Sequence, residues 1–202
     1  MIDEPVAFGT SGVRGRVEDL TDDVCARFTA RFLEVLGRSG PVQGLALGID
    51  RRPSSPRMAA ACAAAARLAG VEVVDYGVLP TPALARQAMA DGVPAIMVTG
   101  SHIPFDRNGL KFYRPEGEIT KDDEAAILAT EVDLPTLGEP EQAPESDRAR
   151  QAYVQRNTDW FAGAPLAGWR VGLYSHSAAG RDVNRAVLEA LGATVVEFGR
   201  SE

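Results

Sequence analysis

The sequence is poor in cysteine and has no long hydrophobic run, and each shortage excludes a class of protein. Two cysteines in 202 residues do not make a disulfide framework. Cys25 and Cys62 lie among apolar neighbours in predicted helices, so we expect buried free thiols rather than a metal site or a disulfide. No apolar run approaches membrane-spanning length, and residues 1–5 lack the basic region and apolar core of a signal peptide. We therefore expect a cytoplasmic protein without a membrane partner.

An excess of positive charge is also missing, because the formal net charge is −7. This balance argues against nucleic acid and anionic membranes as partners. Arginines nevertheless gather in glycine-rich segments: Arg14 and Arg16, Arg51 and Arg52, Arg107 with Lys111, and Arg181. Such clusters suit a small anionic substrate, although solvated surface arginines explain each one singly. With 45% apolar and 24% charged residues, the composition is that of a soluble globular protein.

Predicted strands and helices alternate along the chain, which indicates an α/β fold. Strands are expected at residues 45–49, 71–76, 95–98 and 109–113, and helices at 21–37, 55–70, 81–92 and 120–131. Because the last of these strands returns directly after a loop, we expect a mixed, mostly parallel sheet. We predict a three-layer α/β/α arrangement with helices on both faces of that sheet.

Cap residues mark the expected starts of these helices. Thr21 predicts a side-chain cap, and Thr120 with Asp123 predicts a capping box. Ser55 and Thr81 are each followed by proline, so they predict two further caps.

A stretch rich in proline and glutamate divides the chain. Residues 132–146 have little apolar content and predict a linker or an extended surface connection. We therefore expect a first domain at residues 1–133, a linker at 134–146 and an incomplete second domain at 147–202. The last part carries a single predicted βαβ unit, which is the first part of a second, similar domain rather than a whole one.

The segment from Val98 to Tyr113 is the most informative part of the sequence. A predicted strand runs into a loop with glycine and proline, and Ser101 follows that strand by three residues. In open α/β sheets, ligands bind just beyond the carboxyl ends of strands. A simple polar turn has the same composition. A Ser–His hydrolase fits less well, because adjacent residues of an extended segment point to opposite sides and no G-x-S-x-G motif is present.

Phosphoryl transfer accounts for the residues that this loop combines. A phosphoserine at position 101 carries roughly −1.5 to −2 charge near neutral pH and three acceptor oxygens. Lys111 behind the loop can offset that charge or move a proton, and His102 can do either because imidazole titrates near neutrality. Asn108 is brought in behind the same loop.

The N-terminal motif is rich in glycine and reads Phe8-Gly9-Thr10-Ser11-Gly12-Val13-Arg14-Gly15. Glycines let a backbone approach an anion, and successive N–H groups form anion-binding concavities. Arg14 adds a planar donor group that suits phosphate. Alone, such a loop is more often structural, and it lacks the spacing of a P-loop.

Together the two motifs resemble the α-D-phosphohexomutase superfamily, which includes phosphomannomutases and phosphoglucomutases. The serine loop of that family resembles Thr99-Gly100-Ser101-His102-Ile103-Pro104, although the family usually has Asn at the position of Ile103 and often Ala at that of Gly100. The continuation Asn108-Gly109-Leu110-Lys111-Phe112 also matches. Two further segments resemble the family, at residues 48–55 and 169–200.

The resemblance implies a role for each matching residue. Ser101 would carry the phosphoryl group between hexose 1-phosphate and 6-phosphate through a bisphosphate intermediate. Lys111, Arg14 and His102 would surround that group. Thr10, Ser11 and Asn108 would contact the substrate or its phosphate. The phosphate on Ser101 would complete a Mg²⁺ site, and an activator of the glucose 1,6-bisphosphate type would phosphorylate the serine.

Several features of the family are not found in this chain. No Asp-Gly-Asp-x-Asp type metal loop is present, and the sugar-recognition and phosphate-binding loops are missing too. We therefore expect the N-terminal part of a hexose-phosphate mutase without its C-terminal domains III and IV. Such a piece would bind Mg²⁺ poorly, be inactive alone and self-associate through its exposed surface. The alternatives are a non-catalytic phosphosugar-binding or regulatory module, or one half of a split enzyme.

Overall fold

The structure is a computed structural model, and it describes residues 6–9, 12–138 and 143–201. A mixed sheet forms its centre, with strands in the order β1-β2-β6-β5-β3-β4 and a short β7 beside β6. These strands are β1 (Val6–Phe8), β2 (Gly12–Arg16), β3 (Gly44–Ile49), β4 (Glu72–Val78), β5 (Ala95–Val98), β6 (Arg107–Arg114) and β7 (Gly117–Glu118). The helices around it are α1 (Asp22–Gly37), α2 (Ser55–Leu68), α3 (Thr81–Asp91), α4 (Lys121–Ala129) and α5 (Arg148–Asp159).

Strand pairing confirms the expected α/β class with a mixed sheet. Strands β3, β4 and β5 are parallel, with β3 between the other two. A helix connects each of these strands to the next one along the chain, which allows the parallel arrangement. Strands β5, β6, β2 and β1 pair antiparallel in that order, so the parallel part is narrower than expected. The carboxyl ends of β3, β4 and β5 therefore meet at one edge of the sheet, where the Ser101 loop begins.

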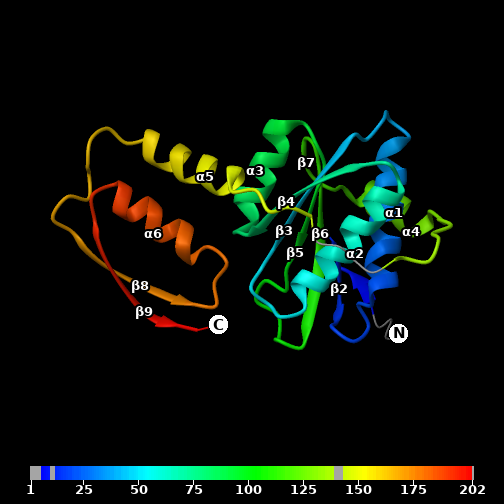
Figure 1. Cartoon of the computed structure of the whole chain (residues 1–202), viewed down its shortest axis with the longest axis horizontal. Coiled ribbons are helices and arrows are strands. Elements are labelled where there is room, and N and C mark those ends of the chain that lie inside the picture. The colour runs from blue at the N-terminus through cyan, green and yellow to red at the C-terminus, as the bar shows by residue number, and fades with distance from the viewer. Residues whose placement is uncertain (1–5, 10–11, 139–142, 202) are drawn as a thin grey trace.

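Helices cover both faces of the sheet, as Figure 1 shows: α1, α2 and α4 lie on one side and α3 and α5 on the other. Alternating residues of the strands fill two cores. Leu47 and Ile96 pack under α1 and α2, whereas Ala95, Met97 and Tyr113 pack on the opposite face. This alternation is the period of two that a sheet with two buried faces requires.

Both cysteines are buried, free thiols, as the sequence predicts. Each lies in the core between α1 and α2. Burial raises the pKa of Cys62 to about 12 and raises that of Cys25 further. A thiol with such a pKa stays protonated at neutral pH and is a poor nucleophile or metal ligand.

Two of the four predicted helix caps form as expected. Thr21 accepts a hydrogen bond from the backbone N–H of Val24, and Thr120 forms a capping box with Asp123. The other two predictions are wrong by one residue, because α2 and α3 begin at Ser55 and Thr81 and neither has a side-chain cap. The hydroxyl of Ser55 donates to Asp50 at 2.6 Å instead, so a tertiary contact replaces the local one.

The predicted βαβ unit is present as β8 (Arg170–His176), α6 (Arg181–Ala190) and β9 (Thr194–Arg200). Strands β8 and β9 are parallel and form a separate two-stranded sheet, which lies beyond α5 in Figure 1. Helix α5 packs on α3, and its Ala149 is buried in the core of the first sheet. Within the predicted linker, Glu145 pairs with Asp75 of β4. No helix in the described part of the chain is long and apolar enough to span a membrane.

Candidate active site at the Ser101 loop

Ser101 lies exposed on a tight turn just beyond the carboxyl end of β5. The turn closes through a hydrogen bond of 3.0 Å from the N–H of Ile103 to the carbonyl of Gly100. Ser101 has a φ of 49°, in the left-handed region that a non-glycine residue seldom adopts. The backbone N–H of Ser101 donates to the hydroxyl of Thr99 at 3.0 Å. The turn thus presents the serine hydroxyl to solvent at the rim of the sheet.

The carboxylate of Asp50, which follows β3, fixes the start of this loop. One oxygen accepts hydrogen bonds from the hydroxyl of Thr99 at 3.0 Å and the N–H of Gly100 at 2.9 Å. The other oxygen accepts from the hydroxyl of Ser55 and from the N–H of Arg52. Four hydrogen-bond donors from the surrounding chain thus bind the Asp50 carboxylate. They hold the carboxylate, and with it the start of the loop, in a single position.

The guanidinium of Arg52 fixes the end of the same loop. It donates to the carbonyls of Ile103 at 2.7 Å, Pro104 at 2.8 Å and Arg107 at 3.0 Å. Its Nε lies 3.4 Å from Asp50. Asp50 and Arg52 together form what we call the serine-loop clamp.

The clamp is the functional feature that the sequence analysis missed. The resemblance links residues 48–55 to the family without a role for Asp50, and the sequence indicates Arg52 only as one of several arginines that suit an anionic substrate. A sequence signal was available, because an aspartate directly after a buried strand lies at the edge where ligands bind. Which loop this side chain would hold, however, depends on strand order, and sequence spacing does not give that order.

Asn108 lies behind the loop and is fully buried. Its amide nitrogen donates to the hydroxyls of Ser54 at 2.8 Å and Ser55 at 3.0 Å. Its amide oxygen accepts from the N–H of Gly109. These contacts make Asn108 a support that joins β6 to the start of α2, and its predicted contact with a substrate stays a prediction.

His102 lies beside the serine, with its Nδ1 atom 3.2 Å from the Ser101 hydroxyl oxygen. The expectation that adjacent residues point to opposite sides is wrong at this position, because Ser101 is left-handed rather than extended. In the part of the chain that the structure describes, no carboxylate is hydrogen-bonded to the His102 ring. A serine hydrolase needs such a group to orient its histidine.

Arg14 and Lys111 lie on one face of the β2–β6 pair, next to the loop. Arg14 is opposite Gly109 and Lys111 is opposite Gly12, so the two cations are diagonal neighbours on the same face of this strand pair. The core residues between them face the other side, towards α1. On β5, Lys111 is opposite Met97. Residues 10 and 11, the predicted Thr10 and Ser11 contacts, lie outside the described residues.

The ammonium of Lys111 forms an ion pair with Glu118 at 2.6 Å and lies 5.2 Å from the centre of the Tyr113 ring. Burial lowers the pKa of Lys111, but hydrogen bonds to Glu118 and Tyr113 outweigh that effect, so the pKa lies above its ordinary value. Lys111 is therefore a permanent cation at neutral pH. This favours a role in offsetting charge over a role as a base.

A pocket of about 850 Å³ opens at the serine loop, and we call it the Ser101 pocket. Its lining includes Ser101, His102 and the clamp, together with residues 176–180 of the βαβ unit. Arg14 and Lys111 do not line it, although Met97 beside Lys111 does. The N-terminal ends of α2, α3 and α6 all reach this pocket, so three helix dipoles place partial positive charge there.

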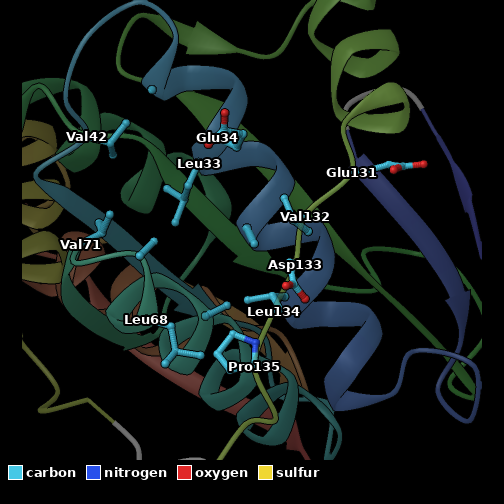
Figure 2. Close-up of a pocket in the computed structure, with 14 residues that line it drawn as sticks. Leu33, Glu34, Val42, Leu68, Val71, Glu131, Val132, Asp133, Leu134 and Pro135 are labelled. Atoms are coloured by element: carbon cyan, nitrogen blue, oxygen red, sulfur yellow. The ribbon is translucent and has the colours of Figure 1, made fainter.

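A second hollow, of about 480 Å³, lies at the carboxyl ends of α1 and α2. Figure 2 shows residues 131–135 running across it, with Leu33 and Leu68 pointing in from the two helices. The charged residues that line it are all acidic: Glu34, Glu131 and Asp133. Helix carboxyl ends add further negative character. An anionic substrate would be repelled from this hollow and attracted to the Ser101 pocket.

The described residues do not supply a metal centre. No group of three or more His, Cys, Asp or Glu side chains within them is placed to hold an ion. Near Ser101, the carboxylate of Asp50 is already occupied by its four donors. The expected Mg²⁺ therefore does not fit the side chains in this part of the chain.

Comparison with known sequences gives a consistent picture. The family described as phosphoglucomutase/phosphomannomutase, alpha/beta/alpha domain I, matches residues 5–133, which is more than half of the chain. A phosphomannomutase of Salmonella muenchen is 54% identical over 199 residues, covering 98% of this chain and 41% of that protein. A phosphomannomutase of Sinorhizobium fredii is 43% identical over 204 residues, covering 96% of this chain and 43% of that protein. The chain thus spans less than half the length of these relatives.

Comparison with solved structures agrees with the sequence matches. A phosphoglucomutase/phosphomannomutase family protein of Burkholderia thailandensis superposes with a TM-score of 0.76 at 26% identity. The superposition covers 94% of this chain and 43% of that structure. Both the first sheet and the βαβ unit are therefore part of the shared architecture.

Proposed function

The chain belongs to the phosphoglucomutase/phosphomannomutase family, and from that premise we propose that it carries the phosphoserine of a hexose-phosphate mutase. The proposed reaction interconverts a hexose 1-phosphate and a hexose 6-phosphate through a hexose bisphosphate. In this proposal residues 1–133 form the phosphoserine domain, 134–146 the connection, and 147–202 the beginning of the next domain.

The observation that carries the proposal is the exposed hydroxyl of Ser101, held on a left-handed turn by the clamp of Asp50 and Arg52. A left-handed serine costs about 1–3 kcal/mol of backbone strain, and such strain persists where the surroundings over-determine it. The clamp supplies that restraint at both ends of the loop. Holding a nucleophile at a fixed point on a positive rim is what phosphoryl transfer requires of a protein.

In the proposed step, the Ser101 oxygen attacks a phosphoryl group of the hexose bisphosphate. An O–P bond forms at the serine as the P–O bond to the sugar breaks. His102, 3.2 Å from the hydroxyl, accepts the serine proton and returns it to the departing sugar oxygen. This bisphosphate forms in the preceding step, when the phosphorylated serine gives its phosphoryl group to the free hydroxyl of a hexose monophosphate. The bisphosphate then reorients, so that Ser101 takes the phosphoryl group from its other end and the isomeric monophosphate leaves.

The remaining predicted residues take supporting roles in this proposal. Arg14 and Lys111 offset the charge of the bound phosphate from the open face of β2 and β6. Thr10 and Ser11 contact the phosphate from the N-terminal loop. Asn108 helps to position the serine loop through its hydrogen bonds to the start of α2.

Other components of the proposed enzyme lie beyond the described residues. Domains III and IV would supply the sugar-recognition and phosphate-binding loops. Mg²⁺, when bound by ligands from elsewhere together with the Ser101 phosphate, would neutralise charge on the transferring group. A bisphosphate activator of the glucose 1,6-bisphosphate type would load the serine.

A chimera tests the proposed function. This chain would replace the matching segment of the Salmonella muenchen relative, and isomerisation of mannose 1-phosphate and glucose 1-phosphate would be assayed. We expect turnover in the chimera, loss of turnover in Ser101→Ala and no loss in Ser39→Ala, an exposed serine after α1. The chain alone is expected to show no turnover. A folded chimera that is inactive, or one whose activity survives Ser101→Ala, would contradict the proposal.

A further inference from the structure

The loop between β8 and α6 of the βαβ unit has features that the proposed function does not use. Residues 176–180 line the Ser101 pocket together with the serine loop. His102 and His176 are the two histidines of the chain, and both line this one pocket. An imidazole is a common group for phosphate recognition because its N–H groups donate and it takes up a positive charge readily.

His176 also shares an unusual backbone conformation with Ser101. Among the described non-glycine residues, these two have a positive φ, 28° at His176 and 49° at Ser101. Strained residues of this kind cluster at sites of function. The two therefore mark two separate segments of the lining of one pocket, which we call its two walls.

An arginine, partly buried in one wall and fully buried in the other, holds the segment around each strained residue. Arg52 binds three carbonyls of the serine loop. Arg181, 2% exposed, donates to the carbonyls of His176, at 2.6 Å, and Ser201. The His176 ring also packs on Tyr174, with 5.2 Å between ring centres. The position of the imidazole is therefore set from both its backbone and its ring.

The two walls are tied together at the pocket. Arg51, next to Arg52 of the clamp, forms an ion pair of 2.7 Å with Asp182 in the first turn of α6. Gly180 approaches Pro80 at the start of α3, where an added Cβ would lie 3.5 Å from the proline ring. These contacts fix the distance between the serine loop and residues 176–180.

We propose that His176, with Ser177 and the start of α6, forms a second recognition subsite for the phosphomonoester group of the hexose phosphate. The subsite rests on the proposed function, because it uses the same pocket and the same substrate class. The imidazole and the Ser177 hydroxyl donate hydrogen bonds to the phosphate oxygens, and the α6 dipole adds partial positive charge. This loop thus makes the βαβ unit part of the binding site as well as part of the scaffold.

Nuclear magnetic resonance of the histidine side chains tests the subsite in the native chain. The chain has two imidazole signals, which a His102→Gln variant would assign. We expect both signals to shift on titration with glucose 1-phosphate and neither to shift with glucose, which lacks the phosphate. Because this titration is carried out on the native chain, its result does not depend on whether a binding-site variant folds.

Affinity measurements on variants complete the test. His176→Asn removes the imidazole but keeps a residue that tolerates the left-handed region. We expect it to weaken glucose 1-phosphate binding by about fivefold to tenfold, the loss expected for one or two hydrogen bonds. The control Glu189→Gln, exposed at the far end of α6, should bind as the native chain does.

Two results would overturn the proposal and are distinguishable. If only the His102 signal shifts and His176→Asn binds normally, the subsite is wrong while the proposed function stands. If neither signal shifts at saturating glucose 1-phosphate, binding of hexose phosphate by this chain fails, and the subsite fails with it.

Discussion

At the scale of single residues, the carboxylate of Asp50 determines the shape of the serine loop. It contacts Thr99 and Gly100 ahead of Ser101, and its partner Arg52 contacts the carbonyls that follow. The loop itself contains few apolar contacts, since Phe105 is 90% exposed. Polar contacts to the clamp therefore have to provide most of its order.

Replacing Asp50 by Asn tests the role of this carboxylate. The amide has the same shape but offers one acceptor oxygen, so at least two of the four donors lose their partner. We expect the free energy of unfolding to fall by about 1–3 kcal/mol and amide exchange across residues 99–107 to accelerate. Hydrogen exchange read by mass spectrometry, with urea unfolding, measures both effects.

The matched control for this substitution is Asp106→Asn, in the same loop but exposed. Its stability and exchange should match those of the native chain. Unchanged protection of residues 99–107 in Asp50→Asn would show that the clamp does not hold the loop.

At the scale of elements, the sequence predicts features that depend on neighbouring residues better than features that depend on tertiary contacts. The caps at Thr21 and Thr120 are correct because each bond joins residues three apart. The cap predicted at Ser55 is wrong by one residue because the Ser55 hydroxyl bonds to Asp50, just after β3. The sequence does not predict β1 or β2, because β1 has only three residues and β2 contains two glycines, which weaken its strand pattern.

The same distinction separates the parts of the site. The position of Ser101 beyond β5 follows from the strand that precedes it, so the sequence predicts it. Its left-handed turn and its contact with His102 depend on the clamp, which joins residues about fifty apart in the chain. The contact of Lys111 with Glu118 depends likewise on the short strand β7, which has no sequence pattern of its own.

The capping box of α4 predicts a pH-dependent stability. Burial raises the pKa of Asp123, but hydrogen bonds from Thr120 and Arg114 outweigh that effect and lower the pKa below its ordinary value of 3.8. A carboxyl with a lowered folded pKa stabilises the fold above its unfolded pKa, and this stability is lost as the pH falls through the folded value. We expect Asp123→Asn to reduce the free energy of unfolding by about 1 kcal/mol at pH 7.

Urea unfolding between pH 3 and pH 7 checks this prediction, with Asp122→Asn as the neighbouring control. The stability difference between the native chain and Asp123→Asn should shrink below about pH 4. Asp122→Asn should remain close to the native chain at each pH. A difference for Asp123→Asn that is constant across the range would contradict the assignment.

At the scale of the whole molecule, the βαβ unit leaves aromatic residues exposed on its small sheet. Tyr174 is 61% exposed and Phe198 is 54% exposed, and their rings lie 5.6 Å apart on β8 and β9. A two-stranded sheet also has two unpaired edges. Exposed apolar patches with open edges favour association.

We therefore predict that the chain self-associates at high concentration. Sedimentation velocity over a series of concentrations should show a rising average mass, and Tyr174→Ser combined with Phe198→Ser should reduce it. The control Leu68→Ser, exposed at the end of α2 on the first domain, should leave the association unchanged. Strictly monomeric behaviour of the native chain would rule out this surface.

The proposed function depends on Ser101 accepting a phosphoryl group. The most direct measurement is intact-protein mass spectrometry after incubation with glucose 1,6-bisphosphate, followed by fragmentation to locate the added group. We predict the gain of a single phosphoryl group on Ser101, its loss in Ser101→Ala and its retention in Ser39→Ala. No gain in mass, or a phosphoryl group located on another residue, would contradict the central claim.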